Sequence, residues 1–478
     1  MIGHGTVVPA AIASALARHV RLEMPMPFGR LFDEQPSIAL EDLDLLEDFL
    51  FEQQGEDLDS AHTPAGFTFF GQFIDHDVTL TESATGAEDD LTALRPASSI
   101  LNLRTPDLEL DSVFGFGPEH PISRVLFRQD GRLLTGADTG HEAWDLPRQG
   151  DGTAIIADPR NDENKIVAQV HAAFIRAYNR LLAEKGNYAE ARIELYHTYQ
   201  YILLNDYLKR FVDPALVEEV REAGAPLYSA MAASAGRKLL VPLEFSVAAF
   251  RFGHSQVRAF YRLNRGPNAA RPIFSDTGPD LNGREPIGAE MRMDFTLFFD
   301  DRLPPGGAGA GGQPPGLNMA RRIDTKLSLP LMHLKNPGIA AAPGTLPDDT
   351  LKSPRSLAKR NLFRARQLSV VSGQRAATLL GQPHLTAEEL GIAQLPLSVQ
   401  LKTPLWYYVL KEAERGGGER LGPVGGRILA ETFLGALLHA ASSYFRLKPA
   451  GWQPPEGRRT MAGLMAYAQE GLPALPQG

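Results

Sequence analysis

The 478-residue sequence contains no cysteine. Without thiols the chain cannot form disulfides, zinc–cysteine or iron–sulfur centres, or a cysteine nucleophile, so any metal must be held by histidine or by oxygen ligands. It also lacks an uninterrupted apolar run of about 18 residues, the length that indicates a membrane-spanning helix. These absences predict a soluble protein, and they leave its redox compartment open because a chain without thiols is indifferent to it.

An excess of positive charge is absent as well. The 48 basic and 57 acidic side chains give a formal net charge of −9, and they are spread along the chain. A mildly acidic protein without a basic patch is not expected to bind nucleic acid or an anionic membrane as its main partner. The sequence leaves the oligomeric state undetermined.

The N-terminus lacks the pattern of a signal peptide. The apolar stretch over residues 7–17 has no Lys or Arg before it, whereas Arg18 and Arg21 follow it. We therefore predict an N-terminal arm over residues 1–28 and one large domain over residues 29–478. The location stays open between the cytoplasm and export without an evident signal peptide.

Glycine and proline number 45 and 36 and gather between helical patterns. Their densest cluster, PPGGAGAGGQPPG, lies within residues 303–317. It predicts a flexible surface loop, because such a stretch cannot bury enough apolar surface to offset its ordering entropy.

Apolar residues recur every three or four positions over residues 164–182, 188–211 and 427–445, which predicts long helices. Strand patterns are limited to short alternations at residues 125–127 and 153–156. The predicted fold class is mainly α, with few short strands and long loops.

The first segment that could carry chemistry is GFTFFGQFIDHDVTLT, residues 66–81. If it is helical, Gln72, Asp75 and His76 share one face, and Asp77 lies about 100° further round. Burying two carboxylates and an imidazole in an aromatic run requires a partner for each. The alternative is a solvated helix end.

The second segment, LRTPDLELDSVFGFG, places oxygen-bearing side chains at every second position of residues 105–111. Such spacing can wrap a hard cation such as calcium, and Asp77 could add a further ligand. An ordinary strand with one polar face is the alternative.

Basic and imidazole groups mark three further segments. IADPRNDEN brings Arg160 to the entry of a predicted helix, where Asn161 or Asp162 could serve as the N-cap. AFRFGHSQ carries His254, and SLAKRNLFRAR carries Asn361. Taken singly, a surface arginine and a satisfied core histidine are the simpler interpretations.

Taken together and in order, GQFIDHD, TPDLELDSVFG, DPRNDEN, FRFGH and RNLFRAR resemble the motifs of the animal-type haem peroxidases of the peroxidase-cyclooxygenase superfamily, in particular its bacterial members. The resemblance runs from about Gly29 to the C-terminal helices. It implies a single helical haem-peroxidase domain that reduces hydrogen peroxide. The implied donors, halides, pseudohalides or phenols, are oxidised through a ferryl intermediate.

The resemblance also implies a role for each matching residue. The implied haem b site consists of the catalytic His76, Arg160 and Gln72, ester links through Asp75 and Glu163, a propionate-binding Arg251, the iron ligand His254, and Asn361 as acceptor of the proximal imidazole N–H. The implied calcium ligands are Asp77, Thr105, the backbone carbonyl of Asp107, Glu109 and Asp111.

These implied roles agree with the chemistry of peroxide cleavage. A neutral imidazole such as His76 can move a proton between the two peroxide oxygens near pH 7. The fixed charge of Arg160 would stabilise the departing hydroxide in a dry pocket. An amide oxygen on the proximal imidazole would raise the iron potential relative to a carboxylate partner. Calcium would tie the Asp77 end of the distal helix to the loop at residues 105–111.

The sequence departs from the family pattern at three positions. Asn164 replaces the methionine that forms a sulfonium link in the most oxidising mammalian members, so bromide, iodide or thiocyanate is expected in preference to chloride. Glu109 stands where many relatives carry aspartate. Arg251 occupies the place, three residues before His254, where fatty-acid oxygenases keep a radical-forming tyrosine.

Two alternative functions remain. A haem-dependent fatty-acid dioxygenase is disfavoured by Arg251, although another tyrosine or tryptophan could hold a radical. A degenerate haem-binding or adhesion protein would be expected to lose His76 or Arg160 first, and both are present.

Overall fold

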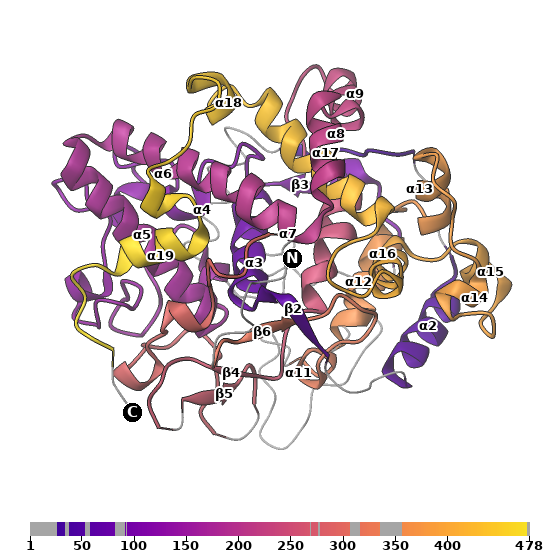
Figure 1. Cartoon of the computed structure of the whole chain (residues 1–478), viewed down its shortest axis with the longest axis horizontal. Coiled ribbons are helices and arrows are strands. Elements are labelled where there is room, and N and C mark those ends of the chain that lie inside the picture. The colour runs from indigo at the N-terminus through magenta and orange to yellow at the C-terminus, as the bar shows by residue number, and fades with distance from the viewer. Residues whose placement is uncertain are drawn as a thin grey trace.

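The structure is a computed structural model that describes residues 26–33, 38–52, 58–81, 91, 93–267, 269–275, 278–305, 316–334 and 356–475. Most of the predicted N-terminal arm (residues 1–25) and the centre of the predicted flexible loop (residues 306–315) lie outside the described residues. The described part is mainly helical with short strands, which confirms the predicted fold class (Figure 1).

The α-helices are α2 (Leu40–Glu52), α3 (Gly66–Val78), α4 (Asp111–Phe114), α5 (Lys165–Lys185), α6 (Tyr188–Ile202), α7 (Lys209–Phe211), α8 (Pro214–Glu222), α9 (Pro226–Ser234), α10 (Leu243–Ser246), α11 (Leu329–Met332), α12 (Leu357–Gln367), α13 (Gly373–Leu379), α14 (Ala387–Leu390), α15 (Leu397–Leu401), α16 (Leu405–Arg415), α17 (Pro423–His439), α18 (Tyr444–Leu447) and α19 (Met461–Gln469). The strands are β1 (Met26–Pro27), β2 (Asp59–Pro64), β3 (Leu101–Asn102), β4 (Phe260–Arg262), β5 (Ala270–Pro272) and β6 (Met319–Arg321). The shorter helical turns used below are the 3₁₀ helices η3 (Ser123–Leu126), η5 (Pro159–Asp162) and η7 (Ala249–His254) and the π turn η6 (Leu203–Leu208).

Helix α3 lies at the centre of the molecule, and all of its residues are buried (Figure 1). Its first residue must be glycine, because a Cβ on Gly66 would lie 2.3 Å from the Phe298 carbonyl oxygen that accepts its N–H. Phe70 and Phe73 stack on Phe174 of α5, with ring centroids 6.4 and 4.6 Å away. Such pairs contribute roughly 0.5–1.5 kcal/mol each beyond their area burial. The segment is therefore a core helix, and the alternative of a solvated helix end is wrong.

Two of the three predicted long helices are confirmed. Asn164 caps α5 by accepting the N–H groups of the first turn, and Gly186 ends it at a φ of 77°, in the left-handed region that favours glycine. The second pattern forms α6, η6 and α7 without a break. The π turn shifts the side chains that follow and packs Tyr207 on α3, where a Cβ on Gly71 would lie 2.4 Å from the tyrosine oxygen.

The third predicted helix, over residues 427–445, is confirmed only in part. Helix α17 ends at His439, since Ala440 is extended with a ψ of 124°. A separate helix, α18, begins after Ser443. Serine side chains compete for backbone hydrogen bonds and favour helix starts over helix interiors, so apolar spacing alone overstated the length.

Both predicted strands are wrong. Residues 123–126 form η3, and Phe127 and Ala154 take part only in isolated bridges. The strands instead form three antiparallel pairs, β1 with β3, β2 with β6 and β4 with β5. The pair β2–β6 matters for the site because β2 runs directly into α3.

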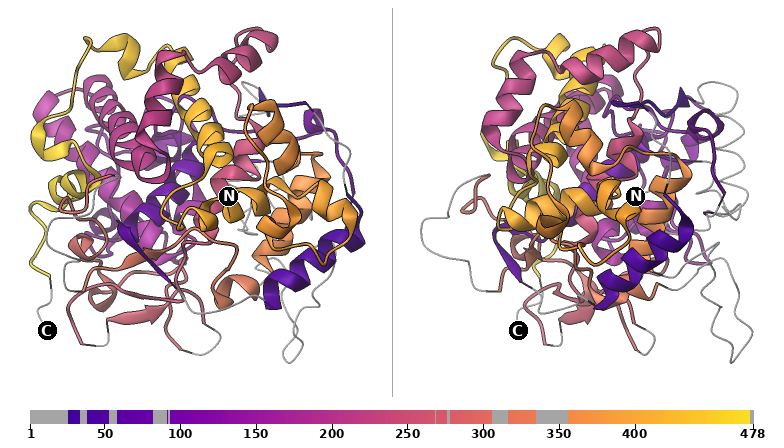
Figure 2. Two further views of the ribbon diagram at one scale, coloured as in Figure 1. Left: turned by 45° about the vertical axis from the view of Figure 1, so that its right-hand side comes forward. Right: turned by 90° about the vertical axis from the view of Figure 1, so that its right-hand side faces the viewer.

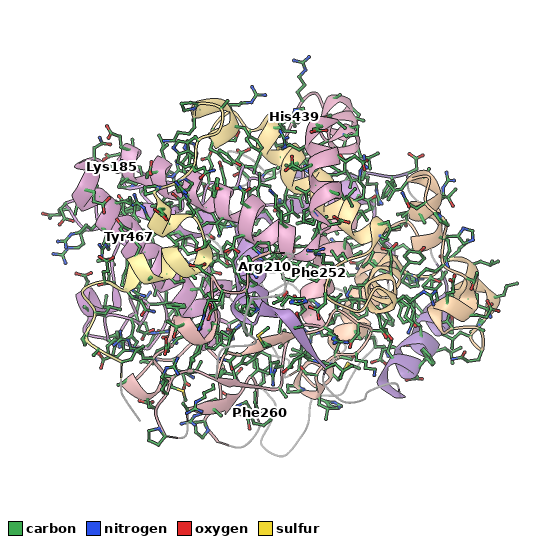
Figure 3. The ribbon with its side chains drawn as sticks, viewed as in Figure 1. Lys185, Arg210, Phe252, Phe260, His439 and Tyr467 are labelled. Atoms are coloured by element: carbon green, nitrogen blue, oxygen red, sulfur yellow. The ribbon has the colours of Figure 1, made fainter. Side chains whose placement is uncertain are left out.

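The helices surround α3 in three groups: α5, α6 and α19; α8, α9 and α17; and α12, α13 and α16 (Figure 1). Helix α2 packs at the edge against α12 and α15 (Figure 2). Figure 3 shows Arg210 of α7 and Phe252 of η7 near the centre of the view. The Arg210 guanidinium lies 3.9 Å from the ring centroid of Phe67 on α3. The contact of α3 with η7 across this core positions the candidate site.

Candidate active site

A small cavity lies between α3 and η7. Gln72 and Asp75 of α3 form part of one wall, and His254 of η7 forms part of the other. Tyr207 and apolar side chains such as Phe250 complete the lining. Three residues predicted from two distant motifs, Gln72, Asp75 and His254, therefore face one cavity.

His76 follows Asp75 on α3 and is fully buried. Its Nδ1 lies 2.9 Å from Oδ1 of Asn161, and Nδ2 of Asn161 lies 2.9 Å from Nδ1 of His171 on α5. Within the described residues, Nε2 of His76 has no hydrogen-bond partner. Burial, together with the nearby Arg160 charge, lowers the pKa of His76 well below its ordinary value, so the imidazole is neutral.

Arg160 lies behind His76. It donates through Nη2 to the carbonyl oxygens of His76 (3.0 Å) and Thr79, while Nε and Nη2 bind the Asp158 carboxylate at 3.0 and 2.7 Å. Its Nη1 atom has no partner within the described part of the chain. The guanidinium is thus held against the C-terminal end of α3, while its Nη1 makes no hydrogen bond within the described residues.

Asp158 also binds a second arginine, because Arg104 Nη2 donates to Oδ2 of the carboxylate at 2.8 Å. Burial alone would raise the pKa of Asp158, but the charges of Arg160 and Arg104 outweigh it and lower the pKa below its ordinary value. Arg104 in turn donates to the backbone carbonyl of Asp111 at 3.2 Å. One carboxylate therefore joins the loop at residues 104–111 to α3.

Gln72 is fixed by the segment that precedes α5. Its Nε2 donates to Oε2 of Glu163 at 3.1 Å, and its Oε1 accepts from Nδ2 of Asn164 at 3.1 Å. Gln72 lines the cavity, so Glu163 lies one side chain away from it. Of the two predicted ester-forming carboxylates, Asp75 lines the cavity and Glu163 hydrogen-bonds to Gln72.

On the other wall, Asn361 of α12 holds the predicted iron ligand. Its Nδ2 lies 2.9 Å from Nδ1 of His254, and its Oδ1 accepts a hydrogen bond of 2.7 Å from Nη1 of Arg251. A guanidinium can only donate, so the amide oxygen must face Arg251 and the amide nitrogen must face the imidazole. The predicted contact is present, but the prediction that Asn361 accepts the imidazole N–H is wrong: Asn361 donates.

The structure places Asp77 next to the loop at residues 105–111, but the predicted calcium ligands do not surround one common point. Asp77 accepts the backbone N–H groups of Leu110 and Ser112 at 3.2 and 3.1 Å. The left-handed backbone of Leu108 and Leu110, with φ of 57° and 61°, gives an irregular loop and rules out the strand alternative.

Side chains of this loop pair with other groups. Thr105 donates to Asp111, and Glu109 accepts from Arg192 of α6 at 2.9 Å. In the described ranges, no three His, Asp or Glu side chains are grouped so that they could hold a metal ion. Burial and the Asp111 carboxylate raise the pKa of Asp77 to about 7, and burial and Glu109 raise that of Asp107 to about 7.

Two residues beside the cavity have properties that would suit a haem and its propionates. Nothing lies within 4 Å of a Cβ built on Gly253, next to His254. Arg251 is buried, and among the described residues its Nη2 has no hydrogen-bond partner and no carboxylate forms a salt bridge with it. Burial and the charge of Arg364 lower the pKa of Arg251 to about 9. A buried guanidinium in this state would gain from an anionic ligand.

Comparisons with known proteins agree with this geometry. Residues 122–277 match the family model for animal haem peroxidase. The chain is 23% identical over 328 residues to myeloperoxidase of Mus musculus, an alignment that covers 54% of this chain and 44% of myeloperoxidase. Part of the chain is thus similar to the animal haem peroxidases.

A second similar protein is a peroxidase-like protein of Margaritifera margaritifera, 26% identical over 258 residues, which are 41% of this chain and 32% of that protein. The chain therefore aligns with less than half the length of either curated relative.

Solved structures with a similar fold include peroxidase A from Dictyostelium discoideum, with a TM-score of 0.58 and 17% identity over 88% of both chains. The fatty acid alpha-dioxygenase of Oryza sativa gives a TM-score of 0.54 and 15% identity over 98% of this chain and 89% of that one. These likenesses show the haem-peroxidase fold.

Several residues that hold the candidate site were not predicted as functional. Asn161 and Asp162 were expected as the N-cap of α5, but Asn164 is the cap, because Asn161 contacts His76 and Asp162 accepts from Arg148 at 2.9 Å. His171 also was missed. Its signal is weak, a single imidazole in the buried apolar stripe of α5.

Asp158 should be critical for stability. Replacing it in Asp158→Asn leaves Arg104 and Arg160 buried without a carboxylate, which should lower the free energy of unfolding by about 3–5 kcal/mol in denaturant titrations. Because its folded pKa is lowered, the Asp158 contribution should be complete above about pH 4 and decline below it. Asp130→Asn is the matched control, since Asp130 pairs with an exposed arginine at the same spacing. A similar loss of stability in both variants would contradict the role of burial.

Proposed function

We propose that the chain is a haem-dependent peroxidase that reduces hydrogen peroxide and oxidises small-anion or phenolic donors. The observation that carries the proposal is the cavity between α3 and η7, which has His254 on one wall and Gln72 and Asp75 on the other. The motifs that supply these residues support assignment to a bacterial branch of the family.

His254 would hold the haem iron through Nε2, and Arg251 would bind a propionate through its unpaired Nη2. Bound haem would supply the iron that takes up the two oxidising equivalents of peroxide. Asn361 contacts Nδ1 of His254, which leaves Nε2 as the nitrogen that would bind a metal, and Nε2 would have to be unprotonated to do so.

His76 would act as the base that cleaves peroxide. Its neutral imidazole, with Nε2 unpaired, can take the proton from one peroxide oxygen and return it to the other. Arg160 would favour the negative charge that develops on the departing oxygen, because its guanidinium is buried and fixed before the reaction. Gln72 is held by Glu163 and Asn164, and it would position the small molecules that bind in the cavity.

Asp75 and Glu163 would link covalently to haem methyl groups as esters. Asp75 lines the cavity, and Glu163 contacts cavity-lining Gln72. Asn164 cannot form a sulfonium link, so bromide, iodide or thiocyanate rather than chloride would be the halide-type donor.

Calcium would bind at Asp77 and the loop of Thr105, Asp107, Glu109 and Asp111. The buried, acidic character of the loop supports this proposal, because hard cations prefer such oxygen atoms. Glu109 would have to exchange its contact with Arg192 for the ion.

A second candidate function is fatty-acid dioxygenation. Tyr207 lines the cavity together with apolar side chains, so a tyrosine is available beside the same site. Against it stands Arg251 in the position three residues before His254.

The haem proposal predicts opposite results for the two histidines. His254→Ala should abolish stable haem binding, seen as loss of the Soret absorption band. His76→Ala should keep the band and slow its response to hydrogen peroxide by about 10² to 10⁴. His384→Ala, at an exposed position, is the control. Fast turnover in His76→Ala would exclude the assigned base. Oxygen uptake with a long-chain fatty acid that Tyr207→Phe abolishes would favour the second function.

Ester links predict that acidified acetone leaves haem on the wild-type protein. Asp75→Ala combined with Glu163→Ala should release the haem into the solvent, measured by its absorbance, whereas Glu190→Ala on the surface of α6 should not. Complete extraction of haem from the wild type would remove the ester proposal and leave the peroxidase proposal intact.

Calcium binding predicts a stability that depends on the ion. At a concentration one hundred times Kd, calcium should stabilise the folded protein by about 2.7 kcal/mol relative to chelator-treated protein. Thermal unfolding of Asp77→Asn should lose this response, and the exposed Asp151→Asn should keep it. Identical unfolding of the wild type with calcium and with chelator would contradict the calcium site.

A further inference from the structure

We propose that Asn161 and His171 fix the tautomer of His76, so that its unprotonated Nε2 is always available to accept a proton. Both would be positioning residues that act through His76 without touching substrate. The expected effect on catalysis rests on the proposed peroxidase function. The hydrogen-bonded arrangement does not, because it involves only side chains of this chain.

The three residues come from three elements and are buried. His76 lies on α3, Asn161 on η5 and His171 on α5, and each is 0% exposed. The distances from His76 Nδ1 to Asn161 Oδ1 and from Asn161 Nδ2 to His171 Nδ1 are both 2.9 Å. The His171 ring also packs edge-on against Phe73 of α3, with centroids 6.0 Å apart. The chain of contacts therefore lies entirely within the core.

The two ends of the Asn161 amide impose opposite states on the two imidazoles. Oδ1 can only accept, so Nδ1 of His76 carries the proton and Nε2 keeps its lone pair. Nδ2 can only donate, so Nδ1 of His171 has the lone pair and its Nε2 carries the proton. Neither Nε2 atom has a hydrogen-bond partner among the described residues.

Only this orientation lets His76 take up a proton without rearrangement. After Nε2 is protonated, the Nδ1–H of the imidazolium still points at an amide oxygen, which stabilises the positive charge. With the amide reversed, Nε2 would already carry the proton and could not act as a base. The hydrogen-bonded series His76–Asn161–His171 is called the relay below. The nearest charged side chains, Arg160 and Asp158, pair with each other and do not hydrogen-bond to Nδ1 or Nε2 of His76.

His171 contributes because it occupies the other end of the amide, so that reversing the amide would require both imidazoles to change tautomer together. It is fully buried and neutral, since burial lowers its pKa to about 3. As an acceptor it holds the NH₂ group of Asn161 and leaves the oxygen for His76. Without it, only His76 would have to change tautomer for the amide to reverse.

Nitrogen NMR of protein labelled with ¹⁵N-histidine tests the tautomers directly. The wild type is measured as purified, and as its reduced carbon monoxide complex where haem is bound, with His76 and His171 assigned from His76→Gln and His171→Gln. The result expected is a protonated Nδ1 on His76 and a protonated Nε2 on His171. A protonated Nε2 on His76, or the same tautomer on both rings, would overturn the proposal.

Stopped-flow reaction with hydrogen peroxide tests the consequence. Asn161→Leu should slow the bimolecular reaction by roughly tenfold to a hundredfold. His171→Leu should slow it less, and adding it to Asn161→Leu should cause no further loss, because His171 acts only through Asn161. Asn179→Leu, which removes an asparagine of α5 that hydrogen-bonds to the Leu133 carbonyl, is the control and should react like the wild type.

The two measurements separate the relay from the proposed function. If the effects of Asn161→Leu and His171→Leu multiply, the residues act independently and the relay is wrong. If the expected tautomers are found but wild-type protein loaded with haem does not react with peroxide, the peroxidase function is wrong and the relay stands. NMR on the wild type requires no substitution at Asn161, so a variant that fails to fold does not prevent the test.

Discussion

The buried carboxylate of Asp158 is placed where three separate parts of the chain meet. It binds Arg160 within its own motif and Arg104 from the loop before α4. Arg160 then reaches the carbonyl of His76 on α3. Two buried arginines would be strongly destabilising without an anion, so the position of α3 relative to both segments depends on this one group. The burial that makes the pairs effective comes from the aromatic packing of α3 on α5.

In the candidate site, two asparagines contact histidines through opposite ends of their side-chain amides. Asn161 offers its oxygen to His76, whereas Asn361 offers its nitrogen to His254. The difference arises from the second neighbour of each amide. His171 can accept from Asn161, but Arg251 can only donate to Asn361. An asparagine beside a histidine therefore has no fixed role. The second residue that its amide contacts determines whether the oxygen or the nitrogen faces the histidine.

The sequence predicted local features that depend on neighbouring residues. The spacing of apolar residues located α5 and the run of α6, η6 and α7. It failed at the end of α17 and at both predicted strands, where backbone conformation depends on distant partners. The strand β2, for example, exists because β6 lies beside it, and more than two hundred positions separate them in the chain.

The sequence by itself determined which chemical groups are available: Gln72, Asp75 and His76 on one helix, His254 with Arg251, and Asn361 on another. Their order along the chain was sufficient to indicate a family. Only the tertiary structure decided that Gln72, Asp75 and His254 line one cavity, that Glu109 pairs with Arg192, and which atoms donate and which accept. Hydrogen-bond polarity and ion pairing depend on contacts between residues far apart in the chain. Motif spacing cannot encode those contacts, and the packing of α3 against α5 and η7 creates them.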